Sequence, residues 1–231
     1  MDPLRLNRVT DLLADAGGPP VLERLMGACV EVLSVTGAGV AVIGDGQHRG
    51  AVAVSDPICG DVDDLQFSLG EGPCIDANHS DGPVLEPDLA LAFGQWPAFA
   101  PAALALGVRA VFSFPLRVGA VDLGVLSLYR DIAGDLEPED LRDAIALSRV
   151  ATHLLLEVEA AIPPGALPAR LAEVIDHRSV VHQATGMIAA QLDTDVATAL
   201  IRLRAYAWTN DRSIDSVATE VVGRRLRFDD G

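Results

Sequence analysis

The feature that most constrains this chain is a break at residues 162–168, which read Ile-Pro-Pro-Gly-Ala-Leu-Pro. Proline removes backbone N–H donors and, with glycine beside it, prevents a helix from running through the segment. A chain of 231 residues is long enough for two modest domains, each with its own core. The sequence therefore predicts a first domain at 1–162, a linker at 163–168 and a second domain at 169–231.

The charge pattern changes at the same break. The whole chain has a net charge of −16, and all 17 of its basic residues are arginine. Residues 1–167 hold 9 arginines and 24 acidic residues, a net of −15, whereas residues 168–231 hold 8 arginines and 9 acidic residues, a net of −1. Taken whole, the charge argues against a nucleic-acid partner. The difference between the two segments instead indicates different partners for the two domains.

The first domain is predicted to be an α+β fold, an antiparallel sheet flanked by helices. Two segments have apolar residues at helical spacing, and four runs of β-forming residues make two pairs around short turns. Pro115 places its strand at a sheet edge or at a bulge. The helices are expected at 21–35 and 140–161, and the strands at 39–43, 50–55, 110–118 and 121–129.

Two stretches between the strand pairs, 67–76 and 82–88, are dense in glycine and proline. Long loops that have structure of their own are commonly functional. We interpret these stretches as loops that form the lid of a pocket.

The second domain is predicted to be an all-α bundle of three helices. Apolar residues recur every three or four positions in 168–192, in 196–207 and in 214–222. Thr194 and Ser213 precede the second and third helices and are residue types that cap helix N-termini. Three helices of this length bury a narrow core of valine, isoleucine, leucine and alanine.

The second domain resembles the ANTAR family of RNA-binding antitermination domains. The resemblance rests on residues 178–188, which read RSVVHQATGMI, and on a spaced set of residues that follows them. ANTAR domains bind paired stem-loops in nascent transcripts as dimers and so prevent an overlapping terminator hairpin. The resemblance thus implies an RNA partner and a homodimer. The spaced set is Ala199, Leu203, Arg204, Ala205, Asn210, Val217, Ala218 and Val221.

The resemblance also implies which residues contact RNA. Arginines meet phosphates, unpaired loop bases are read by hydrogen bonds and stacking, and a glycine lets a backbone approach closely. The alternative is that Arg178 and Arg204 only solvate helix faces. Arg224 and Arg225 can add phosphate contacts. The predicted RNA-binding residues are Arg178, Gln183, Gly186, Arg202, Arg204 and Arg212.

The chain departs from the family at two positions. Where the family usually shows Glu-Gln-Ala-Lys-Gly, this chain has His182 and Thr185 in place of the glutamate and the lysine. The loss of one charged contact is expected to weaken RNA binding by roughly 1 to 3 kcal/mol rather than to abolish it. Tyr206 and Trp208 can stack on a base, although their helical spacing favours partial core or an interface.

The first domain resembles a GAF sensor domain in residues 67–76, 83–85 and 96–99 and in the strand pair at 108–129. The resemblance implies a pocket for an unknown small-molecule ligand, and we expect it at Phe67, Cys74, Phe112 and Phe114. The absence of lysine argues against a cyclic-nucleotide ligand. Cys74 is the candidate for bilin attachment, and small-core packing is the alternative. Haem ligation stays open for His48, His79 and His153, and the cofactor is unknown.

The sequence shows neither the ligand spacing of a metal site nor a nucleophile, phosphate-loop or dinucleotide motif, so we expect no catalytic residues and no metal. It also lacks a secretory signal and a membrane-spanning run, which predicts a cytoplasmic protein without a membrane partner. The leading hypothesis is an antitermination regulator in which the GAF domain senses a signal and the helix at 140–161 transmits it. Two alternatives stay open, a protein-interaction module that binds no RNA and a thiol-dependent methionine sulfoxide reductase built on the three cysteines.

Overall fold

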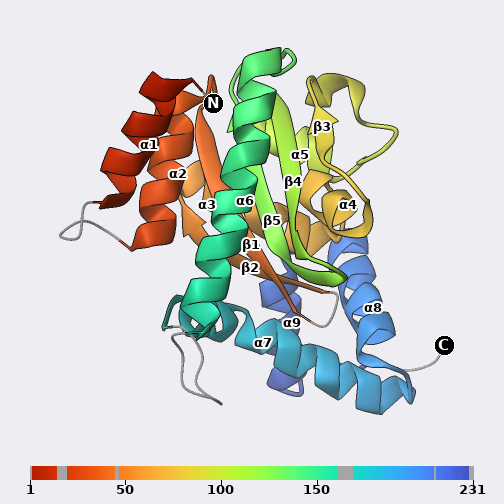
Figure 1. Ribbon diagram of the computed structural model, residues 1–231. Helices are drawn as coiled ribbons and strands as arrows, with labels where there is room; N and C mark the ends of the chain where they lie inside the picture. Colours follow the sequence, from red (N-terminus) through yellow and green to blue (C-terminus); the bar gives the residue numbers. More distant parts are fainter. Residues whose placement is uncertain (1, 15–19, 45–46, 161–168, 211, 229–231) are drawn as a thin grey trace. The chain divides into compact units, whose positions relative to one another are not determined.

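The computed structural model describes residues 2–14, 20–44, 47–160, 169–210 and 212–228 (Figure 1). The predicted linker at 163–168 lies outside the described residues. The chain divides into two compact units. The first comprises 1–67 and 71–168, and the second comprises 68–70 and 169–231. Within the described part of the chain, no helix is long and apolar enough to cross a membrane.

The first unit is built on an antiparallel sheet of five strands in the order β2-β1-β5-β4-β3. This confirms the predicted fold class, and the four predicted strands are all present. The new strand, β3, is short and pairs with β4 at the edge of the sheet. The strands are β1 (Gly37–Gly44), β2 (Gln47–Val54), β3 (Val84–Glu86), β4 (Ala110–Val118) and β5 (Val121–Arg130).

One face of the sheet carries the main hydrophobic core, under α2 (Val21–Val32) and α6 (Pro138–Ala160). Figure 1 shows α6 running across this face. Phe112, Phe114, Leu126 and Leu128 point from the strands into this core and are at most 2% exposed. Burial of the apolar surface in this core is the dominant contribution to the stability of the first unit.

A further helix, α1 (Pro3–Ala14), was not predicted and packs against α2. Its Arg5 bonds the carboxylates of Asp140 and Asp143 on α6 at 2.8 and 2.9 Å. Both carboxylates are almost fully buried, and Asp140 also accepts a hydrogen bond from the backbone of Ser34. These bonds outweigh desolvation and lower the pKa of Asp140. Arg5 therefore ties the N-terminal helix to α6.

The opposite face of the sheet is covered by short helices where we expected long loops. Phe67 lies in α3 and Cys74 lies in α4. Within the second predicted loop, 82–88, residues 84–86 form β3. The prediction of loops was wrong because Pro57 and Pro73 stand at the first helical position, where proline is favoured, so turn-forming residues here mark helix starts. These elements are α3 (Pro57–Leu69), α4 (Pro73–His79), a 3-10 turn (Leu89–Leu91) and α5 (Phe99–Ala105).

Pro115 lies where β4 has a paired strand on one side. Strand β3 pairs with residues 111–113 of β4 and ends there, whereas Pro115 pairs with Val125 of β5. A register shift follows between Leu116 and Arg117. The strand is thus locally an edge, which accommodates a residue without an N–H.

The second unit contains the three predicted helices, α7 (Ala169–Leu192), α8 (Val196–Thr209) and α9 (Ile214–Val222), each in contact with the other two. Ser213 caps α9 as predicted and accepts a hydrogen bond from Ser216 N at 3.2 Å. The prediction that Thr194 caps α8 was wrong. The cap is Asp195, whose carboxylate accepts from Thr198 N at 2.9 Å and has the shape and charge that an N-terminus favours.

We predict that Phe112→Ala destabilises the first unit by about 3 to 5 kcal/mol, because it leaves a cavity in the core under α2 and α6. Leu91→Ala is the matched control, since Leu91 is 83% exposed and its truncation should change stability by less than about 0.5 kcal/mol. Urea unfolding of the full chain, followed by circular dichroism, measures both. Equal effects of the two variants would contradict this placement of the core.

Candidate nucleic-acid interface and sensor pocket

The predicted RNA-binding residues lie on α7, on α8 and in the segment before α9. Gln183 and Gly186 of α7 and Arg202 of α8 are exposed, and Arg204 is half-buried. A Cβ added at Gly186 would meet nothing within 4 Å, so a ligand can approach the backbone closely there. The side chain of Arg178 lies outside the described residues. Whether these residues contact RNA stays a prediction.

Arg212 is engaged within its own unit. Its guanidinium bonds the Glu220 carboxylate at 2.9 and 3.1 Å and the Ser216 hydroxyl at 2.9 Å. The bond to Glu220 raises the pKa of Arg212 and lowers that of Glu220. Arg212 thus connects the segment before α9 to the helix itself, and a phosphate would have to compete with a carboxylate for it.

Thr185 lies on the buried face of α7. It is 1% exposed and shares this face with Val181, Ala184 and Ile188. Its hydroxyl donates to the Val181 carbonyl at 2.6 Å, which satisfies the polar group inside the helix. In this chain, position 185 therefore serves packing, and a lysine there would need to extend its ammonium out of the core.

Residues 196–228 hold the excess of positive charge in the chain. They include six arginines and three acidic residues, Asp211, Asp215 and Glu220, a net of +3. One of the acidic residues is paired with Arg212. We call Arg202, Arg224, Arg225 and Arg227, which are all exposed, the exposed arginines.

The two aromatic residues of α8 differ in their surroundings. The ring of Tyr206 packs on Phe228 with centroids 5.2 Å apart, and the Phe228 N–H donates to Gln191 Oε1 at 2.9 Å. Tyr206 therefore holds the C-terminal segment against α8. Trp208 is 63% exposed, so it does not belong to a core within its unit, and the alternative of an interface stays a prediction.

A small pocket lies between α3 and the sheet of the first unit. Its free volume is about 10 Å³, roughly enough for one water molecule. Most of its wall is apolar, and the residues that argue for a site are the polar side chains of that wall and the cysteine. These are Cys59, Asp63, Gln66, Ser127 and Tyr129.

Hydrogen bonds hold the polar wall of this pocket in place. Tyr129 donates its hydroxyl to Asp56 at 2.7 Å, and Asp56 also accepts from Cys59 N at 3.1 Å. Burial, followed by the bond and charge of Asp56, raises the pKa of Tyr129. Asp63 accepts from the Ala51 backbone of β2 at 2.9 Å. The polar side chains that close the pocket therefore already have hydrogen-bond partners.

The predicted pocket residues do not line this pocket. Phe112 and Phe114 lie on the opposite face of the sheet, in the main core. Cys74 is fully buried against Ala41, Ala77 and Val125, and Phe67 is buried on α3. Sequence reasoning missed Cys59, Asp63, Gln66 and Tyr129. The signal was Gly39 within a strand, because a Cβ there would lie 2.7 Å from the Cys59 sulfur.

Helix α4 covers the sheet beside the pocket and is held at both ends. At its start, Gln66 Oε1 accepts from Cys74 N at 2.7 Å, and Gly72 has φ +132°, where a Cβ would meet the Gln66 side chain. Glu71 caps α5 by accepting from the backbone N–H groups of Ala98 and Phe99 at 2.7 and 2.8 Å. These bonds fix the position of the segment that we expected to form the lid of a pocket.

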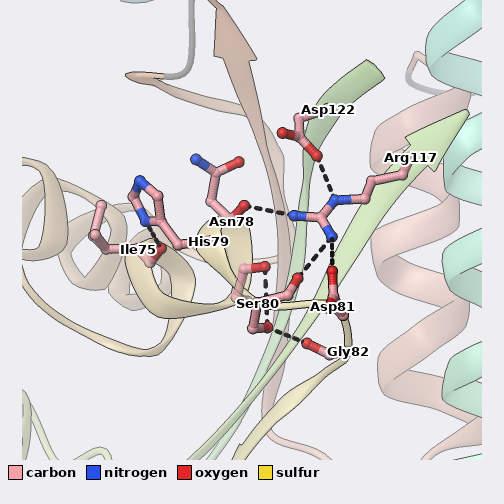
Figure 2. Close-up of polar contacts among 9 residues, drawn as sticks. Ile75, Asn78, His79, Ser80, Asp81, Gly82, Arg117 and Asp122 are labelled. Carbon is pink, nitrogen blue, oxygen red and sulfur yellow. Dashed lines mark hydrogen bonds and ion pairs between the residues drawn. The ribbon is translucent and has the colours of Figure 1, made fainter. Parts of the chain in front are cut away.

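Arg117 of β4 holds the other end of α4 (Figure 2). Its Nη2 donates to the Asn78 carbonyl at 2.6 Å and its Nη1 to the Ser80 carbonyl at 2.7 Å. Its Nε bonds the carboxylate of Asp122 on β5. An arginine here satisfies carbonyls that the helix leaves open and places positive charge at the negative end of the helix dipole. Arg117 thereby fastens α4 to the β4-β5 hairpin.

The three cysteines are buried free thiols, each at most 5% exposed. Burial raises the pKa of Cys29 to about 12. Burial, together with the charges of Asp56 and Asp63, raises the pKa of Cys59 well above its usual value. A thiol reacts as the thiolate, so the raised pKa values lower the reactivity of Cys29 and Cys59. Among the described residues, no cluster of histidine, cysteine and carboxylate side chains can hold a metal ion.

Comparison with known proteins identifies the second unit. The family model of the ANTAR domain matches residues 169–222, which include α7, α8 and α9. The chain carries a GAF-like domain followed by an ANTAR domain. An ANTAR domain implies RNA binding in antitermination. None of the curated proteins compared with the chain matches it.

The GAF-like domain is shown by similarity to solved structures. The GAF domain of an Acinetobacter phosphoenolpyruvate-protein phosphotransferase is 10% identical, with a TM-score of 0.53, over 71% of this chain and 99% of that one. Its counterpart from Coxiella burnetii is 18% identical, with a TM-score of 0.51, over 71% and 97%. The free methionine-R-sulfoxide reductase of Neisseria meningitidis, solved with its substrate, is 14% identical, with a TM-score of 0.51, over 68% and 89%. At these identities the similarity shows the fold alone.

We predict that the thiols of the native protein resist alkylation by iodoacetamide at pH 8, because burial raises the pKa of Cys29 and Cys59 and so lowers the thiolate fraction. All three should react in denaturant, which is the control for reagent quality. Mass spectrometry counts the modified cysteines. Rapid labelling of one cysteine in the folded protein would revive the reductase alternative.

We predict that Arg117→Met loosens α4, since it removes two bonds to helix carbonyls and the ion pair with Asp122. A charged hydrogen bond contributes about 1.5 to 3 kcal/mol, so amide hydrogen exchange in residues 73–80 should become at least about tenfold faster. Arg142→Met is the control, because Arg142 is exposed and donates to the Pro138 carbonyl within its own helix, α6. Unchanged exchange in α4 would show that Arg117 does not hold it.

Proposed function

We propose that this protein is a signal-responsive transcription antitermination regulator that acts in the cytoplasm as a homodimer. Its ANTAR domain binds paired stem-loops in nascent transcripts, and its GAF-like domain controls that binding. The observation that carries the proposal is the ANTAR match over 169–222, a segment that ends beside the exposed arginines. No catalytic role is proposed for either domain.

The charge of the ANTAR domain supports RNA binding. Affinity for a nucleic acid comes largely from phosphate contacts, which release counterions and make binding salt-dependent. The net of +3 in residues 196–228 stands out in a chain of −16. Arginine also keeps its charge and bonds phosphate through two N–H groups at once, so an arginine-only basic set suits this task.

The pocket between α3 and the sheet supports a sensor role for the GAF-like domain. A ligand larger than a water molecule must displace part of the polar wall, and each displaced group already has a hydrogen-bond partner. Binding would therefore move α3 relative to the sheet. Helix α6 contacts β4 and β5 and ends at Ala160, just before the linker, so it is the element that transmits a change in the sheet along the chain.

We predict that Arg202→Ala lowers the salt dependence of RNA binding, with the slope of log K against log salt falling by about one, because one phosphate contact is lost. Arg212→Ala should lower the slope less, since Arg212 is engaged with Glu220. The measurement is fluorescence anisotropy of full-length protein with stem-loop pairs selected from a library with randomised loops.

The matched control is Arg149→Ala, which removes an exposed arginine of the GAF-like domain and should leave the slope unchanged. A parent protein that selects no RNA from the library at low salt would overturn the proposal. In that case the protein-interaction alternative would be the better account.

A further inference from the structure

Trp208 is the most exposed of the large aromatic side chains in the described residues, at 63%, although tryptophan usually buries most of its surface. The inner face of α8 is formed by Ala199, Leu200, Leu203 and Ala207, which are all buried. Trp208 follows the last of these and points away from that face. Nothing in the packing of the three helices therefore accounts for a tryptophan at this position.

The neighbours of Trp208 on the outer face of α8 combine apolar and cationic groups. Ile201 is one of them and is 62% exposed. Arg204 precedes Trp208 by four residues and so neighbours it on the helix, and Arg202 follows Ile201 on the exposed surface of α8. An exposed indole with a guanidinium group beside it and another on the same helix suits unpaired nucleotides, because the ring stacks on the base while the cations meet the phosphates.

Resting on the proposed function, we propose that Trp208 is a stacking residue for an unpaired loop base of the bound RNA. The local charge favours RNA over a protein partner. The chain as a whole has a net charge of −16, but residues 196–228, which include Trp208, have a net of +3. Tyr206 does not share the role, because its ring packs on Phe228.

The chain offers a direct optical test. It has two tryptophans, and Trp96 is 2% exposed and donates to Asp76 at 3.1 Å, so Trp208 alone is accessible to a base. Selected stem-loop RNA should quench part of the emission of the full-length protein. In Trp208→Phe, the remaining Trp96 emission should not respond to RNA.

Affinity measurements separate stacking from charge and from fold. Trp208→Ala should weaken binding about 5- to 150-fold at every salt concentration and leave the salt slope unchanged, since stacking releases no counterions. Trp208→Phe, which keeps a ring, should retain most of the affinity. Ile201→Ala is the matched control on the same face and should change affinity less than twofold. Abasic substitution of the contacted loop nucleotide should weaken the parent protein and leave Trp208→Ala unaffected.

Each other outcome overturns this inference in a distinguishable way. RNA binding that survives Trp208→Ala unchanged overturns the stacking role and leaves the proposed function intact. Loss of self-association in both Trp208→Ala and Ile201→Ala, measured by analytical ultracentrifugation without RNA, assigns the face to a second copy of the chain. Failure of the parent protein to bind any selected RNA overturns the stacking role and the proposed function together.

Discussion

Burial of the central strands on both faces is the constraint on which the GAF-like domain depends. On β5, Leu126 and Leu128 face one core while Val125 faces the other, and all three are fully buried. A sheet that is apolar on both sides requires helices on both sides. The two covers differ in kind. Helices α2 and α6 bring a large apolar core, whereas α4 adds a cluster of Ala41, Cys74, Ala77 and Val125.

This difference indicates where the domain can open. Apolar contacts hold α2 and α6, and their separation from the sheet would expose the core that dominates stability. The other cover combines buried apolar side chains such as Val62 and Ala77 with hydrogen bonds. Asp63 and Gln66 accept these bonds and Arg117 donates them, and water can replace them. A ligand that enters beside α3 therefore perturbs the less costly face. Under the proposed function, the movement would reach α6 through the strands that the two faces share.

The sequence supported the sheet, the flanking helices and the three-helix domain because these elements have clear apolar periodicities. It failed for residues 57–79, where Pro57 and Pro73 resemble turn signals but begin helices. It also assigned Phe112 and Phe114 to the pocket, because strand alternation alone does not say which face meets the core. Arg117 bonds residues 78 and 80, at the end of α4, and Asp122 on β5, and no local sequence pattern predicts contacts between segments this far apart.

Net charge is a poor guide to function in a chain whose two domains differ this much. The acidic GAF-like domain repels RNA at a range set by the Debye length, about 8 Å at physiological salt. In the proposed RNA complex the exposed arginines would act at contact distance, where salt screens the attraction less. Raising salt would therefore weaken attraction and repulsion together, and a slope measured on the full chain would understate the number of phosphate contacts. A stacking contact such as the one proposed for Trp208 escapes this cancellation, because it gives the ANTAR domain affinity that the acidic domain does not oppose.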